Sequence, residues 1–188
     1  MKRCGLGVSR GLLFWDAWGP RTTGGGHPYE THERKQYGKG LSNMMIRAAT
    51  AADADALLEL NNLFGNETTL QLLKQSILEN NHEIVGIAYK DNLAVGYCTG
   101  LVIQSMCYST RRLDIEALYV KERHRRQGIG KALLAFVEQR GTARGICHVH
   151  MNVHSDNEIA LDAYSKHGYT PSGEVLLEKD VQCRCSPQ

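Results

Sequence analysis

The stretch that most constrains this chain is HRRQGIGKALL, residues 124–134. It places Gly128 and Gly130 directly after Arg125 and Arg126 and just before an apolar repeat with helical spacing. Glycine has no Cβ, so backbone N–H groups can approach an anion and the chain can take positive φ. The first turn of a helix offers unpaired N–H donors at the positive end of the helix dipole. The stretch therefore predicts an anion-binding loop between a strand and a helix.

Two common phosphate-binding loops do not fit this stretch. A P-loop needs a hydroxyl residue after its lysine, but Ala132 follows Lys131, and no glycine lies five residues before Gly130. A dinucleotide-binding fingerprint needs a small residue where the chain has Leu133, and it needs an acidic residue at the end of a following strand. The pattern R/Q-x-x-G-x-G/A fits residues 125–130 in full.

Two flanking segments make this pattern specific. The segment LYV at 118–120 ends the strand before the loop, and NEIALDAYSKHGY follows at 157–169. Together the three segments resemble the GNAT superfamily of acetyl-CoA-dependent N-acetyltransferases, over about residues 45–181. The resemblance implies the GNAT fold of the α/β class. That fold has a central mixed, mostly antiparallel sheet flanked by helices, with strands that splay apart at the cofactor site.

Hydrophobic periodicity and turn signals give an element order that agrees with this fold. Capping boxes are predicted at Thr50 with Asp53 and at Ser155 with Glu158, each at the start of a helix. The predicted elements are a strand at 45–50, helices at 52–64 and 68–80, hairpin strands at 83–90 and 93–105 joined by Asp91-Asn92, a strand at 111–120, a helix from 129, a strand at 147–153, a helix from 155, and a last strand or hairpin at 168–181.

Composition divides the chain near residue 44. Residues 1–43 hold nine of the 19 glycines and show no sustained period, which predicts a flexible or non-native extension. An acetyltransferase domain at 44–182 and a polar tail at 183–188 follow. The six cysteines have no regular spacing, which indicates reduced thiols and a cytoplasmic protein. No apolar run reaches the roughly 20 residues of a membrane span, so we expect no membrane association.

Charge is distributed unevenly along the domain. Residues 117–150 carry seven Lys or Arg and two Asp or Glu, whereas residues 46–116 carry five and nine. The basic part suits phosphates and the acidic part suits a cationic amine. The net charge of +2 gives no general attraction to nucleic acid, so no nucleic-acid partner is expected. His148 and His150 alternate on one predicted strand without completing a ligand set, so we expect no metal.

The resemblance also implies which residues hold acetyl-CoA. The backbone amide of Leu118 would donate to the developing oxyanion, Tyr119 belongs to the same strand segment, and Val120 would bond the pantetheine arm. Asn157 would bond pantetheine or nearby backbone. The loop residues that would hold the diphosphate are Arg125, Arg126, Gln127, Gly128, Ile129, Gly130 and Lys131.

The resemblance further implies the catalytic groups. Glu116 would remove the proton of the amine, directly or through water, and Tyr164 would protonate the leaving thiolate. Asp114 shares a strand face with Glu116 and is a reserve on the substrate side. Glu67, between the first two helices, is a candidate acceptor contact. The residues alone leave other roles open: Glu116 also fits a paired strand carboxylate, and Tyr164 also fits a core tyrosine.

The function expected from this resemblance is transfer of an acetyl group from acetyl-CoA to a primary amine. The acceptor is a small cationic molecule, aminoglycoside- or polyamine-like, and attack is direct within a ternary complex. The alternatives are a protein N-terminal or lysine acetyltransferase and a catalytically inactive CoA-binding sensor or interaction module. The resemblance allows a homodimer without requiring one.

Overall fold

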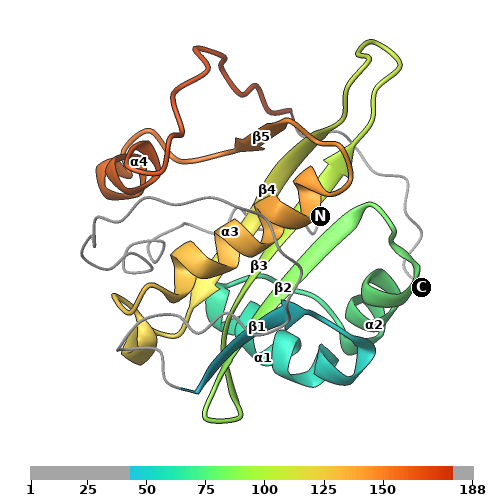
Figure 1. Cartoon of the computed structure of the whole chain (residues 1–188), viewed down its shortest axis with the longest axis vertical. Coiled ribbons are helices and arrows are strands. Elements are labelled where there is room, and N and C mark those ends of the chain that lie inside the picture. Colours follow the sequence, from blue (N-terminus) through green and yellow to red (C-terminus); the bar gives the residue numbers. More distant parts are fainter. Residues whose placement is uncertain (1–42, 180–188) are drawn as a thin grey trace, which may run out of the picture.

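The computed structural model describes residues 43–179. The predicted polar tail and, apart from Asn43, the predicted N-terminal extension lie outside these residues. Figure 1 shows the helices and strands that follow. In chain order they are β1 (Met44–Ala48), the short 3₁₀ turn η1 (Ala51–Asp53), α1 (Ala54–Phe64), α2 (Leu70–Glu79), β2 (Glu83–Lys90), β3 (Leu93–Ile103), β4 (Arg112–Val120), the 3₁₀ turn η2 (Glu122–His124), α3 (Ile129–Thr142), β5 (His148–Met151) and α4 (Glu158–Ser165).

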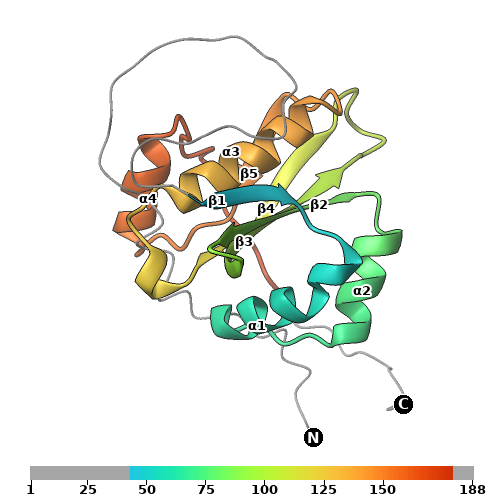
Figure 2. The ribbon, with the colours of Figure 1, turned by 60° about the horizontal axis from the view of Figure 1, so that its bottom comes forward.

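The strands form one sheet in the order β1-β2-β3-β4-β5. The first four are antiparallel neighbours, and β5 pairs with β4 in parallel. A parallel pair needs a crossover connection, and α3 supplies it. Figure 2 shows α1 and α2 on one face of the sheet and α3 on the other. The prediction of a mixed, mostly antiparallel sheet flanked by helices is confirmed.

The hairpin between β2 and β3 has the predicted two-residue turn. Asp91 and Asn92 take φ values of 50° and 63°. Positive φ at both central residues defines the type I′ turn, which matches the twist of the flanking strands. The turn therefore fixes how β2 and β3 pair at this end of the hairpin, and Lys90 at the end of β2 pairs with Leu93.

Each face of the sheet has its own core. On one face, the predicted apolar stripe of α3 is buried, with Leu133 and Val137 fully enclosed. On the other, Leu57 and Leu60 of α1 pack with Tyr97 of β3 and its neighbours. The sheet is thus packed between two helical layers, and β4 has side chains directed toward each of them.

The start of α1 is fixed by a buried carboxylate. The Thr50 N–H donates to Asp53 Oδ2 at 2.7 Å, as in the predicted capping box, and Arg47 donates to both carboxylate oxygens at 2.6 and 2.7 Å. The Tyr89 hydroxyl adds a hydrogen bond of 2.7 Å. Burial opposes ionisation of Asp53, but these hydrogen bonds outweigh it and hold its pKa well below the usual range. Helix α1 is thereby anchored to β1 and β2.

Two local predictions near the C-terminus are wrong. Asn157, not Ser155, caps α4, because Asn157 Oδ1 accepts from the Ala160 N–H at 3.1 Å. The last strand or hairpin is absent from residues 170–179, which are exposed and irregular. Pro171 lacks an N–H, and the apolar residues of 175–177 are consecutive instead of alternating, so neither a ladder nor a one-sided apolar face forms there.

Candidate active site

The loop between β4 and α3 has the backbone that an anion site requires. Gly128 takes φ 80° directly before α3, and among residues 43–179, its chain neighbours aside, no atom lies within 4 Å of the position where its Cβ would be. No side chain caps the helix. The N–H groups of Ile129, Gly130 and Lys131 belong to the first turn, where the helix itself provides no acceptor. These donors and the open space around Gly128 fit a diphosphate.

The predicted loop side chains play different parts. Arg126 and Lys131 are exposed, in keeping with charges near an anion. Arg125 is not such a charge: it is buried, its Nε donates to the Val120 carbonyl at 3.0 Å, and its Nη1 lies 3.6 Å from Glu122 Oε1. That Arg125 helps to hold the cofactor stays a prediction from the sequence. Its side chain turns inward and ties the loop to the end of β4.

A lysine that the sequence did not point to supports the same loop. Lys90 Nζ, at the end of β2, donates to Gln127 Oε1 at 2.6 Å, and Gln127 Nε2 donates to the Arg123 carbonyl at 3.4 Å. Lys90 is 37 residues away along the chain. The hairpin turn after Lys90 was the available signal, because it places the end of β2 close to the end of β4.

In the part of the chain that the structure describes, the second half of β4 has a free edge on the side away from β3. β5 pairs only with Arg112 to Ile115, although β4 continues to Val120. The Lys121 N–H donates to Val95 O of the β3 segment, so the alternating N–H of Leu118 and that of Val120 point away from β3. They face the gap where β5 no longer pairs. The predicted splay and the predicted donors Leu118 and Val120 agree with this geometry.

Tyr119 does not share that geometry. Its N–H lies in phase with that of Lys121 and points toward β3. Its side chain is buried on the α1 face, with ring centroids 5.9 Å from Phe64 and 6.4 Å from Tyr97. That Tyr119 contacts the cofactor stays a prediction, and its side chain belongs to the core beneath α1.

Glu116 occupies an irregular position in β4. Thr99 pairs with Ala117 and Gly100 pairs with Ile115, so Glu116 is the extra residue of a β-bulge. A bulge re-aims a side chain and often lies beside an active site. Within residues 43–179, no hydrogen bond or ion pair holds the Glu116 carboxylate. Desolvation, followed by the charges of Asp114 and Glu83, raises its pKa above the ordinary value. A raised pKa suits a base that works near neutrality.

Asp114 is a weaker candidate for the same role. Arg112 Nη2 donates to Asp114 Oδ2 at 3.2 Å, and Arg112 Nε lies 3.0 Å from Oδ1. This ion pair compensates the charge of Asp114, whereas Glu116 is uncompensated. The geometry therefore favours Glu116 as the base, with Asp114 as a neighbour that raises the Glu116 pKa.

Tyr164 lies on α4 and is buried on the α3 face of the sheet. Its ring meets that of Tyr169 edge to face, with centroids 5.7 Å apart. Burial, together with the nearby Cys98, raises the pKa of the Tyr164 hydroxyl, so it keeps its proton at neutral pH. A protonated hydroxyl is the form that a general acid requires. Asn157 caps α4, because its Oδ1 accepts a hydrogen bond from the Ala160 N–H, and this bond stabilises the first turn of the helix.

With this geometry described, the family can be identified. Residues 56–169 match the model of the Acetyltransferase (GNAT) family, which is more than half of the chain. The chain belongs to the GNAT acetyltransferase family. Both the predicted family and the predicted enzyme class, an acyltransferase, are confirmed at this level.

Individual GNAT relatives are distant in sequence. Over 110 residues the chain is 26% identical to N-acetyltransferase 8 of Homo sapiens, a match that spans 58% of this chain and only 48% of that relative. Over 106 residues it is 24% identical to the aminoglycoside N(6′)-acetyltransferase type 1 of Salmonella typhimurium, covering 55% of this chain and 73% of that one.

A solved structure confirms the GNAT fold. The acetyltransferase AAC(6′)-Iy, in complex with the bisubstrate analogue CoA-S-monomethyl-acetylneamine, superposes with a TM-score of 0.66 at 21% identity. The match covers 74% of this chain and 99% of that chain. Within residues 43–179 of this GNAT chain, no helix is both long and apolar enough to cross a membrane. The same residues contain no group of His, Cys, Asp or Glu arranged for a metal ion.

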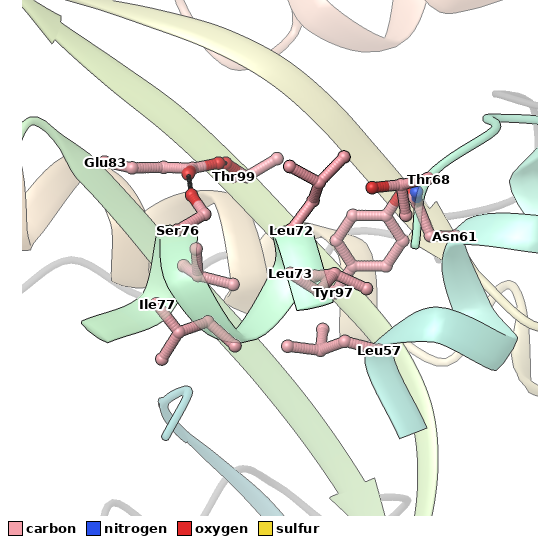
Figure 3. Close-up of a pocket in the computed structure, with 11 residues that line it drawn as sticks. Leu57, Asn61, Thr68, Leu72, Leu73, Ser76, Ile77, Glu83, Tyr97 and Thr99 are labelled. Carbon is pink, nitrogen blue, oxygen red and sulfur yellow. Dashed lines mark hydrogen bonds between the residues drawn. The ribbon is translucent and has the colours of Figure 1, made fainter. Parts of the chain in front are cut away.

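On the face opposite α3, the GNAT domain has an open cavity of about 280 Å³ between the sheet and helices α1 and α2 (Figure 3). Thr99, on its floor, pairs with Ala117 beside the β4 bulge, and the charge of the lining residue Glu83 acts on Glu116, so the cavity lies one strand away from the bulge. The predicted acceptor contact Glu67 is exposed next to this cavity but does not line it. The lining residues are Leu57, Asn61, Thr68, Leu72, Leu73, Ser76, Ile77, Glu83, Val85, Tyr97 and Thr99.

Sequence reasoning did not find the polar residues of this cavity. Asn61 lies on α1, where its Oδ1 accepts from the Tyr97 hydroxyl at 2.7 Å, and Glu83 begins β2. They come from separate elements and belong to no local motif. The only signal was the acidic bias of residues 46–116, which includes Glu83.

Proposed function

We propose that this GNAT chain transfers the acetyl group of acetyl-CoA to the primary amine of a small cationic acceptor. One observation carries the proposal. Strand β4 presents the N–H donors of Leu118 and Val120 on its free edge and the uncompensated carboxylate of Glu116 at its bulge. The two reactants would thus approach β4 from different sides, the thioester at the gap and the amine from the cavity.

The loop residues would hold acetyl-CoA. The N–H groups from Gly128 to Lys131 would bind its diphosphate, and Arg126 and Lys131 would add charge. Lys90 and Arg125 would act indirectly, since they bond to Gln127 and to the Val120 carbonyl. When bound, acetyl-CoA supplies an acetyl thioester, which an amine can attack.

The protein groups would then manage protons and charge. Glu116 would accept a proton from the incoming ammonium group, and the neutral amine that results has a free lone pair to attack the thioester carbon. The Leu118 N–H would stabilise negative charge on the carbonyl oxygen. The Tyr164 hydroxyl would donate its proton to the departing sulfur. Holding both reactants on β4 would supply much of the acceleration through proximity.

Several findings support acceptors of low molecular weight. The aminoglycoside N(6′)-acetyltransferase and the complex of AAC(6′)-Iy are relatives whose names refer to small amines. The cavity beside Glu116 is of small-molecule size. A cytoplasmic location and a homodimer remain predictions from the sequence.

The direct test is a screen of primary amines with acetyl-CoA, following release of free CoA thiol. The proposal expects thiol release that requires both the amine and an intact Glu116. Background hydrolysis that no amine accelerates, with acetyl-CoA shown to bind, would contradict acetyl transfer and favour a CoA-binding sensor.

A further inference from the structure

The acceptor cavity is polar at its two ends and apolar between them. Figure 3 shows Glu83, Ser76 and Thr99 at one end and Asn61 and Thr68 at the other. The remaining lining side chains are apolar or aromatic: Leu57, Leu72, Leu73, Ile77, Val85 and the ring of Tyr97. A ligand that fills the cavity therefore meets a long apolar surface and few hydrogen-bonding groups.

Helix α2 supplies much of that apolar surface without burying it. Its sequence LQLLKQSILE is rich in leucine and isoleucine, yet none of its residues is fully buried. In α1, by contrast, Leu57 and Leu60 are almost completely enclosed. Leu73 and Ile77 of α2 face the cavity and remain partly open. An apolar ligand that covers the open part of these side chains removes apolar surface from water and so gains free energy.

Glu83 is the one charged residue in the lining. Its carboxylate accepts hydrogen bonds from the hydroxyls of Ser76 and Thr99, the latter at 2.6 Å, and from Asn80 Nδ2 at 3.5 Å. All three donors are neutral, and no cation among residues 43–179 pairs with Glu83. A half-buried carboxylate held in position by neutral donors favours a cationic ligand, which would supply the missing counter-charge.

The position of Glu83 relates this end of the cavity to the chemistry. Thr99, which bonds to Glu83, pairs with Ala117 directly after Glu116. An ammonium group at Glu83 thus lies on the side of the cavity that leads to the β4 bulge. The opposite end, at Asn61 and Thr68, is left for the far end of the ligand.

From these observations we infer that the acceptor is an amine with an apolar carbon skeleton, an aryl-alkyl or alkyl amine. Its ammonium group binds Glu83 on the way to Glu116, and its skeleton lies along Leu73, Ile77 and Tyr97. This inference rests on the proposed acetyl transfer and narrows its substrate class. A polyhydroxylated polycation such as an aminoglycoside fits less well, because each of its hydroxyls that is buried without a hydrogen-bond partner weakens binding.

The test compares 2-phenylethylamine and hexylamine with neamine and spermidine as acceptors, by thiol release. We expect kcat/KM for the two apolar monoamines to exceed that for the polycations by about tenfold or more, equivalent to about 1.4 kcal/mol. Glu83→Gln should raise KM for 2-phenylethylamine by about tenfold with kcat nearly unchanged, because binding is lost and not the reaction itself. Glu79→Gln removes the same charge from an exposed site on α2 and is the matched control.

Calorimetric binding of 2-phenylethylamine to the full chain separates the possible failures. Faster transfer to neamine or spermidine than to both monoamines would overturn the inference and leave acetyl transfer intact. Absence of transfer to every amine, with 2-phenylethylamine binding that Glu83→Gln weakens, would overturn the proposed reaction and uphold the ligand class. Equal kinetics in Glu83→Gln and Glu79→Gln would remove Glu83 from acceptor binding.

Discussion

The phosphate loop and the acceptor cavity lie against the same sheet but are built differently. The loop is one continuous segment whose donors are backbone N–H groups, and two of its residues, Arg126 at φ 59° and Gly128 at φ 80°, take positive φ. The cavity takes side chains from α1, α2, β2 and β3, and its polar ends depend on Glu83 and Asn61. Cofactor binding should therefore depend on the backbone conformation of one short segment, whereas acceptor choice should depend on individual side chains.

The largest effect is expected from Gly128→Val. A β-branched side chain disfavours φ 80° at a cost of about 1–3 kcal/mol, and its bulk would occupy the space that the diphosphate needs. We expect the Kd for acetyl-CoA to rise by about 100-fold or more, equivalent to about 2.7 kcal/mol, as measured by calorimetry.

Gly145→Val provides the control for backbone strain. Gly145 has φ 78° and open space around its Cβ position, but it lies beyond the C-terminal end of α3. Both variants should lose similar stability, and only Gly128→Val should lose cofactor affinity. Similar losses of affinity in the two variants would mean that the effect comes from general destabilisation and not from the loop.

The next effect concerns the acceptor side. Glu116→Gln should lower kcat/KM for the amine by about 100-fold, because an amide cannot accept the proton, while acetyl-CoA affinity stays unchanged. The Glu116 pKa is raised, so in the native enzyme the carboxylate form accumulates only above that raised value, and the rate should climb with pH through it. The measurement is a pH profile of kcat/KM.

Glu116→Gln should remove the rise of kcat/KM with pH that the Glu116 carboxylate causes. If the variant keeps both the native rate and its rise with pH, another group is the base. Asp114→Asn then becomes informative, because Asp114 is the neighbouring carboxylate on the same strand.

A smaller effect is expected at Tyr164. Replacement by phenylalanine keeps the ring that packs against Tyr169 and removes only the hydroxyl. We expect kcat to fall by about tenfold or more, with unchanged affinity for acetyl-CoA. Steady-state kinetics and calorimetry on the same preparation test this. An unaltered kcat would assign Tyr164 to the core alone.

The smallest effect is expected from Lys90→Met, which keeps the aliphatic chain but breaks the bond to Gln127. The Kd for acetyl-CoA should rise only about threefold, equivalent to about 0.7 kcal/mol, since Lys90 supports the loop from behind. Arg126→Met is the comparison, because Arg126 is exposed at the loop itself. A larger loss at Lys90 than at Arg126 would mean that Lys90 contacts the cofactor directly.

The same difference in construction explains what the sequence could predict. The glycines of the loop, the β2–β3 turn and the apolar stripe of α3 are local signals, so the loop, the hairpin and most of the element order along the chain were predictable. Glu116 could be named, but its bulge could not, because the bulge is defined only by the pairing of β4 with β3. The sequence could not show that Arg125 is buried while Arg126 is exposed, because only the fold turns the Arg125 side chain inward.

The cavity could not be predicted from the sequence for a related reason. Glu83, Asn61 and Thr99 come together only after the sheet and two helices have packed. The predicted last strand failed in residues 170–179 because apolar content alone does not supply alternation or a pairing partner. Side chains that depend on tertiary contacts are therefore the part of the site that local patterns miss.

The central claim is that backbone N–H groups of the loop bind acetyl-CoA. It is tested most directly by amide chemical shifts in ¹⁵N–¹H spectra during an acetyl-CoA titration. The account predicts the largest shifts at Gly128, Ile129, Gly130 and Lys131, joined by Leu118 and Val120 on the free edge of β4. Saturable binding that leaves these six amides unmoved and shifts others instead would contradict it.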